Sequence, residues 1–381
     1  MTDRNIGKKH KILILDNSLN MGGLEKKLFE FVSRIDTDRF AVAICCLKEG
    51  GYFREPFKEL GVPFYENIQS SRYDPRAYNR LSRIIREEKA DIIYSFAHSN
   101  TVLLSHIAMM NRLVRAWIVS LHATGSPSGG RLIGPVTKRM LSRVSRFIAV
   151  AHEHKKYLVE VEGLPADNIE VIHNGVNVRK YHPGPAKSAL KKELGIEPGD
   201  RVITTIASLN PRKRHDLLLQ AAADVLERHP RARFLLVGGG PERQRLERMA
   251  EDLAIGERVI FAGIRDDVDD ILRASELFVL SSMRGTETFP NVLLEAMACG
   301  LPVVSTDVGS VRELVAADES ATVVPPENAG KLAAAIDTLL ADEEKARAFS
   351  VAGRRIVEER FTIEQMCEKR EKLFDALLAD S

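Results

Sequence analysis

The chain has 381 residues, 44% of them hydrophobic, which is enough for two or three domains with cores of ordinary size. Its 55 basic residues are balanced by 53 acidic ones, and a formal net charge of +2 gives no general attraction to nucleic acid. The four cysteines lack metal-ligand spacing and no apolar run could span a bilayer, so we expect a cytoplasmic protein without a zinc site.

Short apolar runs alternate with amphipathic helical segments through the first half of the chain. This alternation is typical of parallel strands covered by helices. The first run, KILILD, ends at Asp16 and is too short for a signal peptide. The predicted strands are residues 11–16, 40–47, 62–65, 91–96, 117–122, 147–150 and 170–173.

A turn-rich segment, residues 180–200, separates this half from a second series of strands. After Pro326 the pattern is helical to the end. We therefore predict an α/β protein with two Rossmann-like, doubly wound domains facing a cleft, residues 1–180 and 181–362. The strands of the second domain are residues 201–207, 233–238, 258–263, 277–280, 302–306 and 321–324.

Two glutamates flank a predicted helix in TETFPNVLLEAMACGLPVVST, residues 286–306. Pro290 suits the first turn of a helix, so the residues around it present backbone N–H donors and the positive end of the helix dipole. Glu295, one turn further along, can accept hydrogen bonds from a ribose, and Glu287 can address a second polyhydroxyl group. A diphosphate between them would meet the helix N-terminus, and this geometry fits a sugar nucleotide. The donors come from Thr288, Phe289, Pro290 and Asn291.

A cationic partner for the diphosphate is expected in ASLNPRKRHDLLLQ, residues 207–220. Arg212, Lys213 and Arg214 lie there between a strand and a helix, and Lys213 is a suitable clamp for phosphate oxygens. A solvated basic turn explains this segment equally well.

Glycine-rich loops follow two strands. Gly22 and Gly23 follow the first strand, where a ligand contact and a tight turn are equally plausible. For the loop 238–240 the tight turn is favoured. Neither loop is GxGxxG, so a dinucleotide site is not indicated.

Two further patterns have a structural and a functional interpretation. Asp267-Val268-Asp269 is a literal DxD, but acidic residues suit the first turn of a helix, so we predict capping and no metal. Residues 131–147 predict a helix with an apolar face and a basic face. Packing on the sheet is favoured for this helix, and peripheral contact with anionic lipid is the alternative.

His98 and His173 are cleft candidates by position, although a lone histidine is more often structural.

These motifs resemble the retaining glycosyltransferases of family 4, which have the GT-B fold. The resemblance covers nearly the whole chain and is strongest from 201 to 315. ETFPNVLLEAMACGLPVV resembles the most specific motif of that family, and SLNPRKRHDLLL resembles its phosphate-clamp segment. Further similar segments are MGGLEKKLFEFV, SLHATG, HNGVN, LVGGGPERQRLE, FAGIRDDVDDILRASELFVLSS and GSVREL.

The resemblance implies a role for each of these sites. Glu287 would approach the donor sugar, Glu295 the ribose and Lys213 the diphosphate, while His122 would contact the transferred sugar. It also implies that the final helix, residues 363–381, crosses back onto the first domain. Further substrate contacts are implied at Gly22, Gly23, Arg212, Gly240 and Arg265.

The sequence departs from the family pattern at three positions. Ser208 stands where an arginine is frequent, and Arg212 or Arg214 is the candidate to compensate. Thr288 replaces a usual glycine, which would narrow the loop, and Asn177 replaces a common aspartate.

The expected function is transfer of a sugar from a nucleoside diphosphate sugar, with UDP favoured, to a glycan or lipid-linked acceptor hydroxyl with retained anomeric configuration. No cofactor, metal or nucleic acid is expected, and the acceptor pocket is expected to draw on loops such as residues 66–76. A glycoside hydrolase, a sugar-nucleotide epimerase and a non-catalytic nucleotide-sugar binding protein are the alternatives.

Overall fold

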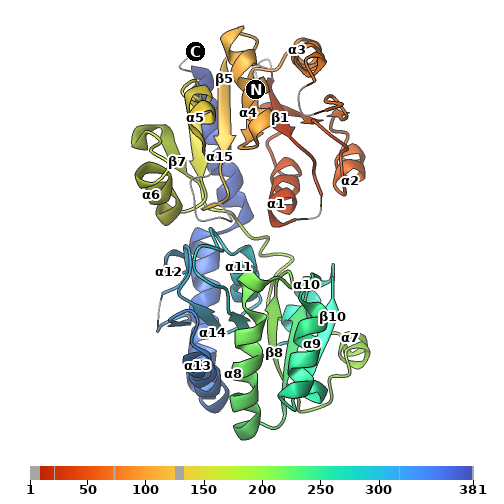
Figure 1. Cartoon of the computed structure of the whole chain (residues 1–381), viewed down its shortest axis with the longest axis vertical. Coiled ribbons are helices and arrows are strands. Elements are labelled where there is room, and N and C mark those ends of the chain that lie inside the picture. The colour runs from red at the N-terminus through yellow and green to blue at the C-terminus, as the bar shows by residue number, and fades with distance from the viewer. Residues whose placement is uncertain (1–8, 21, 72–73, 125–132, 317, 380–381) are drawn as a thin grey trace, which may run out of the picture. The chain divides into compact units, whose positions relative to one another are not determined.

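The computed structural model describes residues 9–20, 22–71, 74–124, 133–316 and 318–379 (Figure 1). The chain divides into two compact units. Unit 1 comprises Met1–Asn174 with Ile363–Ser381, and unit 2 comprises Gly175–Thr362. Each unit has its own parallel sheet, so the predicted fold class is confirmed. The sequence prediction placed the boundary between the domains after residue 180.

Unit 1 is built on a seven-stranded sheet of order β3-β2-β1-β4-β5-β6-β7. The change of direction between β1 and β4 is the switch point of a doubly wound sheet. The strands are β1 (His10–Asp16), β2 (Phe40–Cys46), β3 (Phe64–Tyr65), β4 (Ile92–Phe96), β5 (Ala116–Ser120), β6 (Arg146–Ala149) and β7 (Ile169–Val171). The helices are α1 (Gly23–Val32), α2 (Arg54–Glu59), α3 (Arg76–Glu88), α4 (Ser99–Met110), α5 (Pro135–Leu141), α6 (His152–Glu160) and α15 (Ile363–Ala379).

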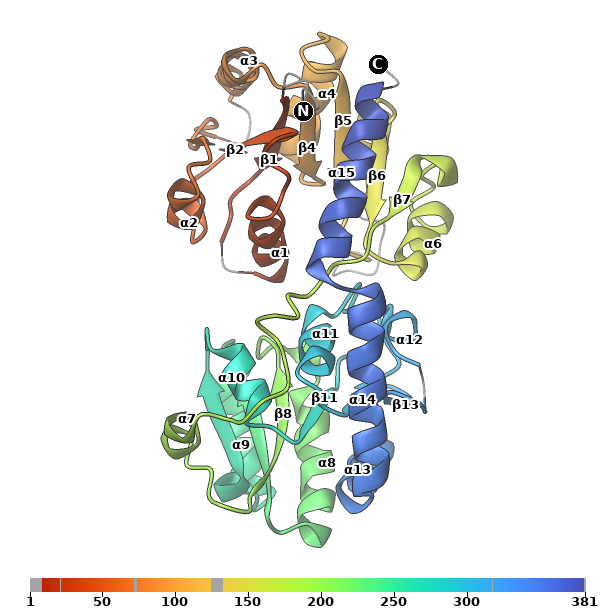
Figure 2. The ribbon, with the colours of Figure 1, turned by 180° about the vertical axis from the view of Figure 1, so that it is seen from behind.

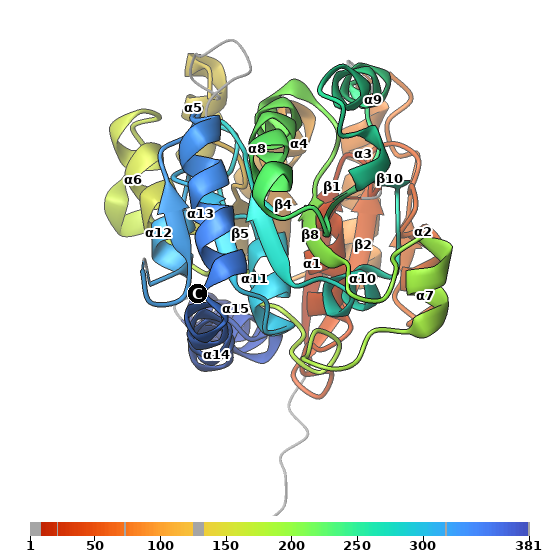
Figure 3. The same ribbon diagram turned by 90° about the horizontal axis from the view of Figure 1, so that it is seen from below.

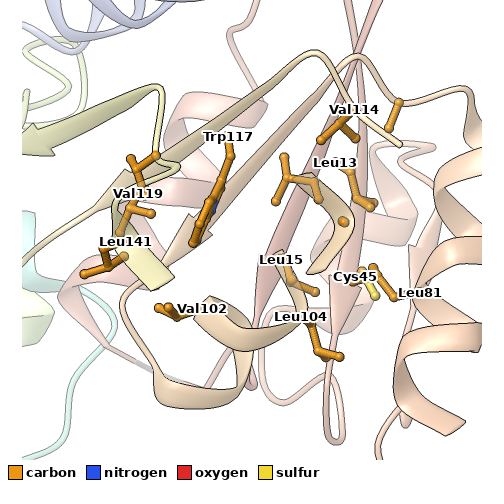
Figure 4. Packing of buried hydrophobic residues seen from close by; sticks show 14 of the residues in the cluster. Leu13, Leu15, Cys45, Leu81, Val102, Leu104, Val114, Trp117, Val119 and Leu141 are labelled. Carbon is orange, nitrogen blue, oxygen red and sulfur yellow. The ribbon is translucent and has the colours of Figure 1, made fainter. Parts of the chain in front are cut away.

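Side chains alternate along each strand, so they point to both faces of this sheet, and helices bury both faces. Leu13 and Leu15 face a core with helices α3 and α4, while Ile12 and Ile14 face the opposite core. Figure 4 shows the first of these cores around the fully buried Trp117. The Trp117 indole N–H donates to Ser95 Oγ at 2.8 Å, so this large ring is buried without an unpaired donor.

The second face of the unit 1 sheet is covered by α1 and by the last helix of the chain, α15 (Figure 2). Phe374 of α15 lies edge-on to Phe40 at 5.7 Å and to Phe31 at 6.1 Å between ring centroids. The final helix therefore completes the core of the first unit, as the resemblance implied.

Unit 2 is built on a six-stranded sheet of order β10-β9-β8-β11-β12-β13, with its switch point between β8 and β11. The strands are β8 (Arg201–Ile206), β9 (Ala232–Val237), β10 (Val259–Gly263), β11 (Leu277–Leu280), β12 (Val303–Thr306) and β13 (Thr322–Val324). The helices are α7 (Ser188–Glu193), α8 (His215–Arg228), α9 (Arg243–Asp252), α10 (Val268–Arg273), α11 (Asn291–Ala298), α12 (Val311–Leu314), α13 (Ala329–Ala341) and α14 (Glu343–Arg360).

The core of unit 2 also lies on both faces of its sheet. Helices α8 and α13 pack against each other and, with α9, cover one face (Figure 3). Helices α7 and α10 contribute to the other face, where Leu190 and Ile271 pack with Leu235. Helices cover both faces of the sheet. The loops that form the candidate site therefore lie at its carboxyl edge, where β8 and β11 end.

The helix predicted over residues 131–147 is too long. Residues 131–132 lie outside the described part of the chain, and α5 covers only Pro135–Leu141 before β6 begins at Arg146. Val136 is 70% exposed, whereas Ile133 and Val144 are buried outside the helix. The expected continuous apolar face does not form, because the chain leaves the helix to enter the sheet. Within the described residues, no helix is long and apolar enough to cross a membrane.

Candidate functional site

The switch point of unit 2 brings together two segments that are distant in sequence. One follows β8 and carries Lys213, and the other follows β11 and carries Glu287. Ligands of doubly wound sheets bind in the crevice at this position, outside the carboxyl ends of the strands. The site is therefore expected where these two segments meet.

Lys213 and Glu287 form an ion pair at the centre of the site. Lys213 Nζ lies 2.5 Å from Glu287 Oε1, and the Ser282 hydroxyl donates to the same carboxylate oxygen at 2.7 Å. Glu287 is 8% exposed, so the pair is weakly screened by solvent. The structure thus brings together two predicted site residues 74 positions apart in the sequence.

The backbone of the segment that carries Lys213 is held by hydrogen bonds to two side chains. Pro211–Lys213 form a 3-10 turn, whose start is capped by the Asn210 side chain accepting from Arg212 N–H at 3.0 Å. The Ser281 hydroxyl donates to the Lys213 carbonyl at 2.9 Å. These bonds fix the lysine backbone, so only the side chain has to move to reach a ligand.

The segment that carries Glu287 depends on Gly309. The φ of Gly309 is +52°, and a Cβ built there would lie 1.8 Å from the Glu287 carbonyl oxygen. The next residue, Ser310, donates its hydroxyl to the Thr288 carbonyl at 2.7 Å. Only glycine fits this contact, since any side chain would push the Glu287 loop away. The sequence interpretation did not identify Ser282, Gly309 or Ser310 as supports of the site.

Helix α11 begins at Asn291, with Pro290 in the N-cap position and no side-chain capping bond. The predicted proline in the first turn thus lies one residue outside the helix. Glu295 is 6% exposed and lies about one turn after Asn291, as expected. The buried Phe289 ring packs on Phe361 with centroids 6.2 Å apart, so its side chain has a packing role.

Two of the arginines singled out from the sequence, Arg265 and Arg214, pair with acidic residues. Arg265 donates to both carboxylate oxygens of Asp267, at 2.8 and 2.7 Å, and pairs with Glu193. These hydrogen bonds raise the pKa of Arg265 above its usual range. Arg214 pairs with Asp216 at 3.0 Å, which leaves Arg212, whose side chain is exposed, as the candidate to compensate for Ser208.

The DxD sequence is part of a network of ion pairs. Asp267 occupies the N-cap position of α10 but makes no side-chain capping bond, which differs from the predicted role. Asp267 binds Arg265, and Asp269 accepts from Arg273 at 2.8 Å. These arginines account for both carboxylates of the motif.

The loop 238–240 confirms the tight-turn interpretation. Gly238 has a φ of +140° and Gly240 a φ of +157°. A Cβ at Gly238 would lie 2.0 Å from the Ala207 carbonyl oxygen, and one at Gly240 would lie 2.3 Å from that of Leu209. The glycines are needed where this turn crosses the segment that leads to Lys213.

His215 was not identified from the sequence. It is the first residue of α8 and is 2% exposed, and neither ring nitrogen has a hydrogen-bond partner. Burial, and then the neighbouring Lys213 charge, lowers the pKa of His215 to about 4. The imidazole is therefore neutral near pH 7 and adds no charge beside Lys213.

In unit 1, the predicted His122 follows β5 and is partly buried. Its Nε2 lies 2.7 Å from the Ser120 hydroxyl. Burial, with a smaller contribution from Arg370, lowers the pKa of His122 well below its usual value, so the ring is neutral. Gly22 occupies the N-cap position of α1 in extended conformation, and Gly23 is the first residue of that helix. A Cβ at Gly22 would lie 2.3 Å from the Glu25 carboxylate.

A polar cavity of about 630 Å³ lies at the carboxyl ends of the strands of unit 1. Asn17 follows β1, Lys48 follows β2, Asn67 follows β3 and His98 follows β4, so the cavity spans the switch point. It includes part of the predicted loop 66–76, of which residues 72–73 lie outside the described part of the chain. The buried Asp16 carboxylate lies 3.4 Å from His98 Nε2 beside this cavity.

Family models match both halves of the chain. Residues 186–356 match the model described as Glycosyl transferases group 1, and residues 21–180 match that of Glycosyltransferase Family 4. These two ranges include all of the predicted site residues.

Two relatives and one solved structure show the extent of the similarity. An N-acetyl-alpha-D-glucosaminyl L-malate synthase of Bacillus anthracis is 29% identical over 85% of this chain and 84% of its own. A GDP-mannose-dependent alpha-(1-6)-phosphatidylinositol monomannoside mannosyltransferase of Mycolicibacterium smegmatis is 30% identical over 74% of this chain and 75% of its own. Anabaena HepE, solved with UDP and glucose, superposes with a TM-score of 0.82 over 96% of this chain and 99% of its own, at 24% identity.

Proposed function

Because the chain belongs to family 4 of the glycosyltransferases, we propose that it transfers a sugar from a UDP-sugar to an acceptor hydroxyl with retention of anomeric configuration. The observation that carries this proposal is the Lys213–Glu287 pair at the switch point of unit 2. A cation and a carboxylate meet there beside the start of α11, as a sugar diphosphate requires.

The proposed donor position follows from these residues. Lys213 turns from Glu287 to the diphosphate, and the positive end of the α11 dipole faces the same oxygens. Glu287 then accepts hydrogen bonds from the donor sugar, and Glu295 from the ribose. Ser282 keeps the Glu287 carboxylate in place when the lysine leaves it.

Catalysis in this scheme rests on electrostatics and positioning. Negative charge develops on the diphosphate as the bond to the sugar breaks, and Lys213 with the helix N-terminus stabilises it. The departing phosphate takes the proton of the acceptor hydroxyl on the same face of the sugar, so no separate protein base is needed. The scheme also needs no metal ion.

Calorimetric titration with UDP in EDTA tests the donor site. We expect micromolar binding, with Lys213→Ala and Glu295→Ala each weakening it by about tenfold or more, because each removes a charged contact. Lys331→Ala is the matched control, since this exposed lysine lies on α13. GDP and ADP follow if UDP gives no heat, and failure of all three with and without magnesium would contradict the proposal.

An epimerase or a non-catalytic binding protein would also bind UDP. These alternatives differ from a transferase in their products. A glycosyltransferase forms a new glycoside only when an acceptor is added, whereas an epimerase alters the donor alone. Product formation that does not depend on an acceptor would favour the epimerase.

A further inference from the structure

The two charged side chains that the proposed donor would bind are engaged with each other in this structure. Lys213 Nζ and Glu287 Oε1 lie 2.5 Å apart, and Glu287 is buried. In the part of the chain that the structure describes, Lys213 is the cation paired with Glu287, and the Ser282 hydroxyl donates to the same oxygen. A diphosphate can therefore bind Lys213 only by taking it from Glu287.

Departure of the lysine would leave Glu287 as a buried carboxylate with a single donor. A buried charge that has lost its partner is costly, because the interior offers little solvation in exchange. The Ser282 hydroxyl supplies one hydrogen bond and no charge. The remaining lone pairs of the Glu287 carboxylate then need a donor from the ligand.

The Glu287 carboxylate is held in a fixed frame, so it does not follow the lysine. Its partner Ser282 lies just beyond the end of β11, and the Ser282 carbonyl accepts from the Thr306 hydroxyl at 2.7 Å. Behind Glu287, the close approach of Gly309 fixes the backbone carbonyl. The long lysine side chain, which is partly exposed, is therefore the member of the pair that moves.

The two parts of a sugar nucleotide affect this pair differently. The diphosphate attracts Lys213, but it offers Glu287 only negatively charged oxygens, which repel the carboxylate. Sugar hydroxyls donate hydrogen bonds, so they can satisfy the carboxylate that the lysine has left. A UDP-sugar thus replaces the partners of both side chains, whereas UDP replaces the partner of Lys213 alone.

We propose that the Lys213–Glu287 pair selects a sugar-bearing diphosphate over a free one, and that the pair re-forms after transfer and releases UDP. Ser282 is the positioning residue that holds Glu287 in both states. Once the sugar has passed to the acceptor, Glu287 loses the sugar hydroxyls and recovers Lys213, which weakens the binding of UDP. This inference rests on the function proposed above and adds a product-release step to it.

Calorimetric titration of the full chain with UDP in EDTA tests the exchange through Glu287→Gln. Glutamine keeps the length of the side chain but carries no charge, so Lys213 is available to the diphosphate. We expect Glu287→Gln to bind UDP about tenfold more tightly than the original chain does. Adding Lys213→Ala to this variant should remove the gain, because the gain comes from the released lysine.

Glu276→Gln is the matched control, because it breaks an ion pair between the same two strands at the opposite edge of the sheet. Glu276 precedes β11 and pairs with Arg201, the first residue of β8, at 2.7 Å. This variant should leave the UDP affinity unchanged. Glu287→Ala is a second variant that should also bind UDP more tightly, and circular dichroism checks that each variant is folded.

Ser282→Ala tests the positioning role. Without this hydroxyl Glu287 depends on Lys213 alone, so UDP should bind about threefold to tenfold more weakly. In the Glu287→Gln variant the same serine change should have little effect on UDP affinity, which distinguishes a positioning role from damage to the fold. Ser275→Ala is the control, because this buried serine lies between α10 and β11 and donates to the Ile271 carbonyl at 2.8 Å.

A second set of titrations measures the effect of the sugar. The probes are UDP-glucose, UDP-galactose and UDP-N-acetylglucosamine, each compared with UDP. We expect at least one of them to bind the original chain more tightly than UDP does. In Glu287→Gln this preference should fall by about tenfold or more, because the variant gains affinity for UDP and loses a charged contact with the sugar.

The inference is overturned if UDP binds the original chain and Glu287→Gln binds it no more tightly, or if none of the UDP-sugars binds better than UDP. Either result leaves the proposed donor site in place, provided that Lys213→Ala weakens UDP binding. If UDP binds neither the original chain nor Glu287→Gln, the donor site itself is contradicted, and the inference fails with it.

Discussion

At the scale of single residues, the site depends on the contact between Gly309 and the Glu287 carbonyl. The Glu287 carboxylate accepts hydrogen bonds from Lys213 and Ser282. Its backbone carbonyl packs against Gly309, 22 positions further along the chain. The position of the carboxylate is therefore decided by packing behind it as much as by its hydrogen bonds.

Gly309→Ala is expected to reduce both activity and stability. The added Cβ would clash with the Glu287 carbonyl, and the left-handed φ of +52° disfavours alanine. We expect a loss of unfolding free energy of about 2–4 kcal/mol, larger than the left-handed backbone cost alone. Donor turnover should fall with it, because Glu287 moves.

The matched control for Gly309 is Gly195→Ala. Gly195 has a φ of +64° but no atom within 4 Å of the added Cβ, so it incurs only the backbone cost of about 1–2 kcal/mol. Denaturant unfolding and initial rates are measured for both variants. Equal losses in the two variants would show that the contact with Glu287 is unimportant.

The stability of unit 1 is expected to depend on pH through Asp16, the last residue of β1. Burial raises its pKa from 3.8 to about 7, opposed by the Asn17 N–H and supported by the Glu25 charge. The folded chain then keeps a proton that the unfolded chain loses near pH 4. Between these pH values the unfolding free energy falls as pH rises, by up to about 4 kcal/mol for a difference of roughly three pH units.

Asp16→Asn removes this dependence, because asparagine does not titrate. The stability of the variant relative to the original chain should therefore rise by about 2–3 kcal/mol between pH 5 and pH 8. The measurement is the unfolding of unit 1 in denaturant at both pH values. Parallel stability profiles of the two proteins would contradict a raised pKa.

At the scale of secondary-structure elements, strands were predicted more accurately than helices. All thirteen predicted strands occur, with ends that differ by one or two residues in most cases. Buried parallel strands are continuous apolar runs, so a strand can be recognised from a few consecutive residues. The helix predicted over residues 131–147 was too long, because Ile133 and Val144 are buried in the core from positions outside α5.

The final helix shows that an element can belong to a core far from it in the sequence. Phe374 of α15 packs on Phe31, Phe40 and Tyr94, which come from α1, β2 and β4. Phe374→Ala is expected to destabilise unit 1 by about 3–5 kcal/mol, because it removes a fully buried ring. Unfolding is followed by the fluorescence of Trp117, which lies in unit 1.

Val136→Ala is the control, because Val136 is 70% exposed on α5 of the same unit. Its truncation should cost less than about 0.5 kcal/mol. If Phe374→Ala left the unfolding of unit 1 unchanged, α15 would not be part of its core.

At the scale of the whole molecule, the two units differ in continuity. Unit 2 is a single stretch of chain whose cores consist of its own residues, whereas unit 1 needs its last helix from the far end of the sequence. Unit 2 can therefore form before synthesis of the chain is complete, and unit 1 cannot complete its core until α15 is present.

Residues 175–362 expressed alone are expected to fold and to bind UDP. The proposed contacts to the nucleotide, from Lys213, Glu287 and Glu295, all lie in this unit. Affinity should be weaker than that of the full chain by no more than about tenfold. Circular dichroism and calorimetric titration check this, with Lys213→Ala in the same fragment as control. A folded fragment without UDP affinity would place essential contacts in unit 1.

The strands, the two parallel sheets and the residue types at the ends of β8 and β11 could all be predicted from local sequence patterns. Hydrophobic runs, turn residues and the Glu287 motif are local, and each can be read within about twenty residues. The motifs also predicted Lys213 and Glu287, each separately, as candidate site residues.

How these residues combine depends on the three-dimensional fold. The crossover in each sheet places β8 beside β11 and β1 beside β4, and this order joins Lys213 to Glu287 and forms the cavity with Lys48. The contact of Gly309 with the Glu287 carbonyl, and the burial of His215, likewise require packing between distant segments. Strand order is set by the free energy of the whole sheet, so no local pattern contains it.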